Sequence, residues 1–236
     1  MPLASPPTSD VTARCQLCAA RLECLIGRLP RAQLERLLPL VREHAFRKGD
    51  LLQTQDRTVS VMRSIKLGSV MLTRSGPDGQ PRPVALVGRA HLLGLAALMD
   101  GSSQVGAEAV SSGRYCEVPA DALRTLLTGD PSHLAGLNRY LLQVLSQLAD
   151  WSQVMRLRGL PRQLMAALML MADDQGSRTV RLPNQVTLAA LLSTTRESVA
   201  RALRRLDETG HLRRIDRWHC ELTDRHLDVF LDEAAR

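Results

Sequence analysis

The chain is poor in aromatic residues and in lysine, and it has no long apolar run. Aromatic side chains are 3% of its 236 residues, so leucine, valine, alanine and methionine must fill the core. The longest strongly apolar stretch without a charge, residues 164–172, is about half of what crosses a bilayer, which excludes a transmembrane helix. Residues 1–10 are rich in proline and serine without an apolar centre, so we expect no signal peptide. We therefore expect a cytoplasmic protein without a membrane partner, in which thiols stay reduced.

Arginine is what the chain has in excess. It has 31 basic residues against 24 acidic ones, a net charge of +7, and only Lys48 and Lys66 are lysine. The planar guanidinium pairs with phosphate and with guanine through two hydrogen bonds, so this balance indicates a nucleic-acid partner. Apolar residues make up 44%, enough for a packed core. A chain of this length forms one large domain or two modest ones.

Short β-like runs separated by glycines fill the region from about residue 45 to 119. Regularly spaced short strands of this kind predict an antiparallel barrel or jelly roll. Asp78-Gly79 is the clearest hairpin turn. A short amphipathic helix over residues 30–41 is expected to precede the strands, because Leu34, Leu37 and Val41 recur at helical spacing.

Seven apolar residues after Pro131 alternate at spacings of three and four over three heptads. They are Leu134, Leu137, Leu141, Val144, Leu148, Trp151 and Met155. An unbroken repeat of this kind predicts the seam of a two-helix coiled coil across a dimer axis. The alternative is a helix that packs on its own domain.

The last third of the chain predicts a helix, a turn, a second helix and a hairpin. Asn184 is a suitable N-cap for a short helix over residues 187–192, and residues 193–195 form the turn. The second helix runs over residues 196–209 and ends at Gly210. A hairpin over residues 212–222 follows, and Thr223 caps a last short helix. This order is that of a winged helix-turn-helix.

The second of these helices has two different faces. Val199, Leu203 and Leu206 share the face that is expected to pack inward. The opposite face consists of Glu197, Ala200, Arg201 and Arg204, at helical spacing. Arginine pairs with guanine and glutamate accepts from cytosine N4, so we expect this face to enter a major groove. Four further arginines are better placed for phosphates: Arg205, Arg213, Arg214 and Arg217.

Three of the five cysteines lie within ten residues, in the pattern Cys15-x2-Cys18-x5-Cys24. In a reducing compartment this spacing favours a metal or a cluster over a disulfide. Zinc and iron–sulfur sites usually have four ligands, so the fourth must come from elsewhere, and Cys116 is the candidate. Zinc binding and a redox dithiol remain open alternatives. Cys220 lies in the predicted hairpin and is expected to be inert.

The segment Thr195-Arg196-Glu197-Ser198-Val199-Ala200-Arg201-Ala202-Leu203 resembles the recognition helix of the CRP/FNR superfamily of bacterial transcription regulators. Phe46-x-Lys48-Gly49-Asp50 and the glycine-spaced strands look like the β-roll sensor domain of that family. The heptad helix looks like its dimerisation helix. The resemblance implies that Arg196 adds a guanine contact to those of Glu197 and Arg201.

The cysteine pattern is similar to that of the oxygen-sensing FNR branch, in which a distant cysteine lies in a C-E-[IV]-P context. Here that context is Cys116-Glu117-Val118-Pro119. In that branch the four cysteines bind a [4Fe–4S] cluster, so the resemblance implies Cys15, Cys18, Cys24 and Cys116 as ligands. It also implies that oxygen attacks the cluster and lowers the affinity for DNA.

The expected fold class is α+β, with an antiparallel β-roll, a long dimerisation helix and a C-terminal winged helix-turn-helix. The expected divisions are a flexible tail with the cysteine-rich segment (residues 1–28), the β-roll (29–130), the dimerisation helix (131–158) and the DNA-binding domain (159–236). The resemblance implies a homodimer on palindromic promoter DNA, with RNA polymerase as a further partner.

Cyclic nucleotide is not an expected ligand. The cyclic-nucleotide regulators of the family carry a glutamate and an arginine that hold ribose and phosphate. Gly94-Leu95-Ala96-Ala97 lacks the glutamate, and Val105-Gly106-Ala107 lacks the arginine. In the oxygen sensors an aspartate in the dimer helix opposes dimerisation, and an ungapped count places Leu148 at that position. The cluster-free chain is therefore expected to be a dimer.

Two other classes of function are compatible with parts of the sequence. A zinc- or thiol-based redox regulator would have the same fold. An enzyme or a small-molecule-binding protein is weakly supported, because the sequence shows no glycine-rich phosphate loop, no paired carboxylates and no nucleophile–base motif. We therefore expect no catalytic residues.

Overall fold

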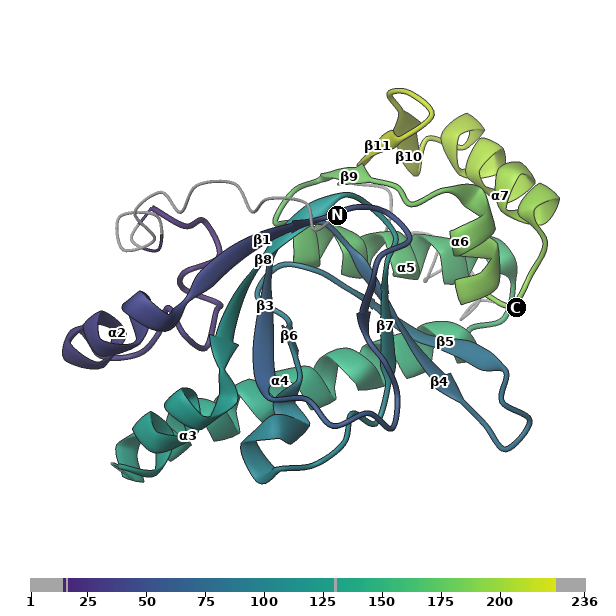
Figure 1. The fold of residues 1–236 in the computed structure, drawn as a ribbon. Helices are drawn as coiled ribbons and strands as arrows, with labels where there is room; N and C mark the ends of the chain where they lie inside the picture. Colours follow the sequence, from purple (N-terminus) through teal and green to yellow (C-terminus); the bar gives the residue numbers. More distant parts are fainter. Residues whose placement is uncertain (1–14, 16, 130, 224–236) are drawn as a thin grey trace, which may run out of the picture.

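A β-roll is followed by a long helix and a helical C-terminal region in the computed structural model, which describes residues 15, 17–129 and 131–223 (Figure 1). Before the roll, the helix α2 (Arg31–Leu37) continues into the 3-10 helix η1 (Leu38–Leu40). Leu34, Leu37 and Val41 are buried, as their helical spacing predicts. The fold class expected from the sequence is confirmed. The flexible tail expected over residues 1–13 and the short helix after Thr223 lie outside the described residues.

Two antiparallel four-stranded sheets form the roll. The first has the order β1-β8-β3-β6, with bounds Arg42–Phe46, Gly113–Pro119, Val61–Leu67 and Leu92–Leu93. The second has the order β2-β7-β4-β5, with bounds Leu51–Gln53, Gly106–Ala109, Val70–Ser75 and Pro81–Val87. Gly79 has φ +70° in the turn between β4 and β5, where the sequence predicts a hairpin. Gly94 has φ +82°, and a Cβ there would meet the Val61 carbonyl oxygen at 2.4 Å, so only glycine fits this corner.

The remaining elements are one 3-10 helix within the roll and the helices and strands that follow the roll. They are η2 (Leu95–Met99), α3 (Ala120–Thr128), α4 (Pro131–Arg156), α5 (Leu160–Gln175), β9 (Thr179–Arg181), α6 (Gln185–Leu191), α7 (Arg196–Glu208), β10 (Leu212–Arg214) and β11 (His219–Leu222). The last three strands pair in the order β10-β11-β9. Asn184 caps α6 by accepting a hydrogen bond from the Thr187 amide at 2.7 Å, as predicted. None of the described helices could cross a membrane.

The sheet β1-β8-β3-β6 separates two clusters of buried side chains. Because successive residues of a strand face opposite sides, Ile65 and Tyr115 face the interior of the roll. Met62 and Cys116 face the other side, where α2, α3 and the cysteines lie. We call the first cluster the inner core and the second the outer core. The cysteine-rich segment therefore packs on the outer face of this sheet, away from the inside of the roll.

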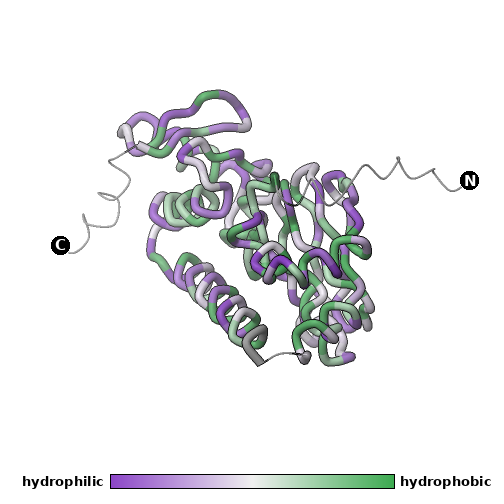
Figure 2. Tube along the Cα trace, turned by 90° about the vertical axis from the view of Figure 1, so that its left-hand side faces the viewer, coloured by the Kyte–Doolittle hydropathy of each residue, from purple (hydrophilic) through white to green (hydrophobic). Residues whose placement is uncertain are grey.

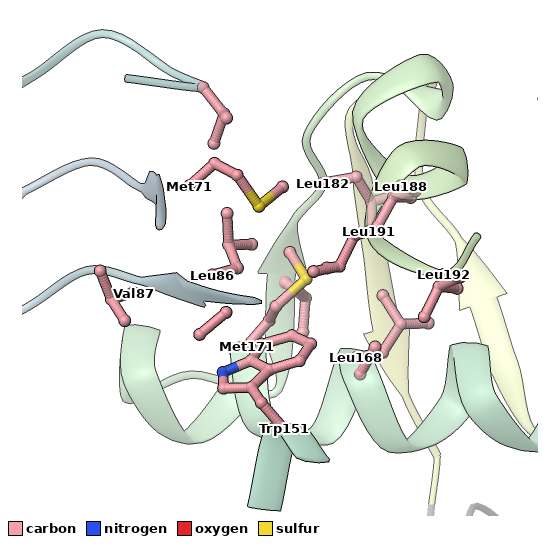
Figure 3. Packing of buried hydrophobic residues seen from close by; sticks show 14 of the residues in the cluster. Met71, Leu86, Val87, Trp151, Leu168, Met171, Leu182, Leu188, Leu191 and Leu192 are labelled. Carbon is pink, nitrogen blue, oxygen red and sulfur yellow. The ribbon is translucent and has the colours of Figure 1, made fainter. Parts of the chain in front are cut away.

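The inner core continues without a break into the C-terminal region. Met71 and Leu86 of the β4–β5 hairpin belong to the same cluster as Leu188 of α6, and Figure 3 shows these side chains gathered between the hairpin, α5 and α6. Trp151 lies beside Met171 in the same view. The C-terminal region is thus packed directly on the roll.

One face of α4 packs on the chain itself, which the sequence leaves open as the alternative to a dimer seam. Trp151 is only 1% exposed and, with Leu148 and Met155, packs in the inner core. Leu137 and Val144 pack against the outer core. Trp151 is thus covered within the chain, as the alternative of a helix packed on its own domain expects. Leu137, Val144, Leu148 and Met155 are only partly buried and keep exposed surface, so the seam stays a prediction.

The outward face of α4 is also apolar. It carries Leu134, Leu141, Leu142 and Leu145, of which Leu142 is 67% and Leu145 63% exposed. Only Leu134 and Leu141 belong to the predicted seam. Figure 2 shows α4 along one side of the roll with hydrophilic and hydrophobic positions mixed along its length. These exposed leucines are an apolar surface that a second copy can contact.

Candidate functional site

The helix α7 presents its polar face to solvent. Its N-cap Thr195 accepts a hydrogen bond from the Ser198 amide at 3.2 Å. Val199 and Leu203 are fully buried against the rest of the C-terminal region, as predicted. The predicted DNA contacts lie on the other side: Arg196, Glu197, Arg201 and Arg204 are exposed and Ala200 is half-buried. The geometry therefore leaves this face open for a groove of DNA.

Three of the arginines predicted to contact DNA have partners within the chain. Nη2 of Arg201 donates to Ser198 Oγ at 3.0 Å, which orients the guanidinium along α7. Nε of Arg213, predicted as a phosphate contact, donates to Glu221 across the β10–β11 pair at 3.0 Å. In the tip of this hairpin, the guanidinium of Arg217 lies 4.4 Å from the ring centre of Trp218.

Four of the five cysteines line a single cavity on the outer face of the first sheet. Three come from the cysteine segment (residues 15 and 17–29), and Cys116 comes from β8. The walls are mostly apolar and include Ile26, Leu38 and Val41. All four are free thiols. Cys220 lies elsewhere, buried in β11 as part of the inner core.

The register of the first sheet supplies the polar floor of this cavity. Cys116 pairs with Glu43 of β1 on one side and with Ser64 of β3 on the other. The Ser64 hydroxyl and the Cys24 sulfur share a hydrogen bond of 3.3 Å. Two residues beyond Ser64, on the same face of β3, Lys66 donates to Glu43 at 2.8 Å. The sequence pattern gives no sign of Ser64, Lys66 and Glu43, because only the register between strands far apart in the sequence brings them to the cysteines.

Two thiols of the cavity are held in the protonated form at neutral pH. Burial raises the pKa of Cys116 to about 12; Cys24 raises it further, and Lys66 opposes the rise. Burial also raises the pKa of Cys15, together with the neighbouring thiols of Cys24 and Cys18. Metals bind the thiolate, so a metal that enters this cavity has to displace these protons.

The donor set fits a thiolate-bound metal group. Soft sulfur ligands in an apolar surrounding are what iron–sulfur clusters and zinc prefer, and four of them reach this cavity from two segments. Within the described ranges, no three side chains of His, Cys, Asp or Glu are arranged to chelate one metal ion. The four cysteines thus share a cavity without forming a mononuclear chelate.

A second cavity, of about 290 Å³, lies between the roll and α4. Its lining includes residues 94–96 and Val105. These belong to the two segments that lack the glutamate and the arginine of the cyclic-nucleotide regulators. Gln53 ties these segments together: its Oε1 accepts from the Gly94 amide at 2.7 Å, and its Nε2 donates to the Val105 carbonyl at 2.8 Å. The Gly94 amide is therefore already bonded. Arg74 is the basic residue of this lining.

Comparison with known families identifies two domains. Residues 43–130 match the cyclic nucleotide-binding domain, and residues 162–227 match the Crp-like helix-turn-helix domain. No curated protein matches the sequence.

Solved structures share the architecture at low identity. The chain is similar to FixK2 from Bradyrhizobium japonicum, with 19% identity and a TM-score of 0.70, over 81% of this chain and 96% of that one. It is similar to the c-di-GMP-responsive global regulator CLP from Xanthomonas campestris, with 16% identity and a TM-score of 0.62, over 82% and 100%. TTHB099, a CRP-family transcriptional regulator from Thermus thermophilus, has 18% identity and a TM-score of 0.61, over 82% and 97%. At these identities the likeness shows the fold.

Proposed function

We propose that this chain, which carries a cyclic nucleotide-binding domain and a Crp-like helix-turn-helix domain, is a redox-responsive DNA-binding transcription regulator of the CRP/FNR family. In this proposal Cys15, Cys18, Cys24 and Cys116 receive the signal. The observation that carries this proposal is the shared cavity. The 92-residue gap between Cys24 and Cys116 (116 − 24) is closed by the fold, while Cys220 lies apart in the inner core. Three of these cysteines are neighbours in the sequence, so the informative observation is that Cys116 of β8 joins them and Cys220 does not.

The proposed cofactor is a [4Fe–4S] cluster. Its four ligands would be the thiolates of the cavity, three from the cysteine segment and one from β8. When bound, such a cluster supplies a group whose integrity depends on oxygen. The chain itself contributes an apolar wall that limits access of water, the Ser64 hydroxyl next to the Cys24 sulfur, and the ammonium of Lys66, which offsets negative charge on the thiolates.

The proposed output is the affinity for DNA. In this proposal α7 enters the major groove, with Glu197 and Arg201 reading a G·C pair and Arg196 adding a guanine contact. A homodimer would place two such helices on an inverted repeat with TTGA- or TGTGA-like half-sites, about one helical turn apart. The exposed leucines of α4 are the surface for the second copy. RNA polymerase is the proposed further partner at the promoter.

The decisive experiment is anaerobic purification with a visible spectrum and an assay of iron and acid-labile sulfide. We expect brown protein that bleaches in air. Replacement of any of Cys15, Cys18, Cys24 or Cys116 by serine should abolish the colour, and Cys220→Ser is the matched control that should keep it. Colourless anaerobic protein with stoichiometric zinc would instead favour the zinc regulator, and colourless metal-free protein would favour the thiol regulator.

A further inference from the structure

The turn between β5 and β6 is bonded to three separate elements of the chain. We call residues 88–92 the junction turn. It makes side-chain bonds to the cysteine segment, to α4 and to α5, the first helix of the C-terminal region. A displacement of any one of these elements therefore reaches the other two through five residues.

The bond to the cysteine segment is an ion pair. Nε and Nη2 of Arg89 donate to the two carboxylate oxygens of Glu23 at 3.1 and 2.7 Å. The side chains are 25% and 39% exposed, so solvent screens this pair less than a fully exposed one. Glu23 directly precedes Cys24 in the chain. The position of this carboxylate therefore depends on where the Cys24 sulfur is held.

The bond to α5 uses the backbone of the turn. Asp174 accepts from the Gly88 amide at 3.0 Å and also from the Arg89 amide. A Cβ on residue 88 would lie 2.2 Å from Asp174 Oδ2, so only glycine admits this carboxylate. Burial raises the pKa of Asp174 to about 7; Arg89 acts against the rise and Glu23 adds to it. The guanidinium of Arg89 thus interacts with two carboxylates, Glu23 from the cysteine segment and Asp174 from α5.

Two further bonds join the turn to α4. Tyr140 Oη accepts from the Leu92 amide at 2.6 Å. His91 is hydrogen-bonded to the side chain of Gln147, which lies further along the same helix. Beside His91, Ala90 has φ +66°, a left-handed conformation that alanine rarely adopts. The turn is therefore held in an uncommon shape by its neighbours.

A cavity of about 260 Å³ lies beside these bonds. Its titratable lining groups are Glu23, Arg89, His91, Tyr140, Asp150, Asp173 and Asp174. The space is large enough for an arginine side chain to change from one carboxylate to the other without displacing the core.

We propose that Arg89 is a positioning residue that passes the state of the cysteine segment to α4 and α5. This inference rests on the proposed function, because it takes the four thiols as the receiver of the signal. When the ligands on the thiols are lost and the cysteine segment shifts, Glu23 withdraws and Arg89 pairs with Asp174. The Asp174 carboxylate then leaves the Gly88 amide, and α5 changes its position against the roll.

The first test compares Glu23→Gln with Glu35→Gln. Glu35 forms an exposed ion pair with Arg31 on α2 and serves as the matched control. The measurement is the ratio of DNA dissociation constants between cluster-free and cluster-loaded protein. We expect Glu23→Gln to keep the iron and sulfide content and to reduce this ratio at least fivefold, while Glu35→Gln keeps the wild-type ratio. A wild-type ratio in Glu23→Gln overturns the proposal.

The second test needs no DNA. In protein purified without oxygen, where Glu23 is paired with Arg89, Glu23→Gln should accelerate hydrogen exchange at the amides of residues 88–92 and 172–176 at least tenfold, and Glu35→Gln should not. Asp174→Asn keeps an acceptor for the Gly88 amide and should protect it better than Asp174→Ala. If wild-type protein holds no iron but the exchange effect is present, the proposed cofactor fails and the junction stands. Unchanged exchange overturns the junction whatever the iron content.

Discussion

Arg201 is the residue at which one substitution can test the proposed contact with DNA. Its guanidinium is exposed on α7 and held by Ser198, ready for a bidentate contact with guanine. We expect Arg201→Ala to lose about 1–3 kcal/mol of discrimination at one base pair. Competition binding against single-base variants of the site measures this. Arg205→Ala is the control, with an equal loss for all sequences; the same uniform loss in Arg201→Ala would make Arg201 a phosphate contact.

His91 predicts a pH dependence of stability. Burial lowers the pKa of His91 to about 4, and the bond to Gln147 opposes this. The unfolded chain therefore binds this proton at a higher pH than the folded one. The free energy of unfolding is complete above pH ~6.5 and falls as the pH drops towards 4, by roughly 3 kcal/mol.

The measurement is urea unfolding of wild type and His91→Gln at several pH values. The difference between the two proteins should change in the range from pH ~6.5 to 4 and stay constant above it. Taking the difference removes the opposite slope of Asp174, whose raised pKa makes the folded state lose stability as the pH rises towards 7. A constant difference over the whole range contradicts the prediction.

At the scale of elements, α4 shows what a sequence pattern does not decide. The repeat from Leu134 to Met155 predicts one continuous apolar stripe, and the stripe exists. The pattern contains no information on whether that stripe meets a second helix or a sheet of the same chain. The roll and its neighbours cover most of it, and the most exposed leucines of the helix, Leu142 and Leu145, fall outside the heptad pattern.

The different burial of Leu145 and Leu148 changes the test of the dimer. Leu145 is exposed, whereas Leu148 packs against the inner core. We expect Leu145→Asp to convert a dimer into a monomer without a change in secondary structure. Leu148→Asp should lower the melting temperature as well, because it places a charge against the core. Sedimentation velocity and thermal unfolding of cluster-free protein distinguish the two, and a dimeric Leu145→Asp would show that α4 is not the interface.

The caps and turns are the most predictable elements, because their chemistry is local. Asn184 and Gly210 act where their residue types predict, and Gly79 forms its hairpin turn. The strands β2 and β7 are not predicted individually, because a three-residue strand and an alanine- and glycine-rich one carry little β signal. The polar floor of the cysteine cavity cannot be predicted from the sequence, because it depends on the pairing of β3 with β8. These strands are far apart in the chain: the paired residues Arg63 and Glu117 are separated by 54 positions.

At the scale of the whole molecule, the inner core makes the roll and the C-terminal region one folding unit. Leu188 of α6 is fully buried in the same cluster as Met71 and Leu86 of the roll. We expect Leu188→Ala to cost about 2–5 kcal/mol and to lower the stability of both regions together. Calorimetry should then show one transition, shifted as a whole. Two separate transitions, with only one of them moved, would mean that the regions unfold independently.

The sheet between the two cores also separates the inner core from the products of cysteine oxidation. Oxidation of a cysteine adds charge and bulk to its sulfur, and at Cys116 these products form on the outer side of β8. The inner side of the same strand carries Tyr115 and faces the packing that supports the DNA-binding helix. Oxidised cysteines therefore lie on the opposite face of β8 from that packing. We expect such a protein to stay folded when its cysteines are oxidised, so that reduction of the reversible products restores the thiols.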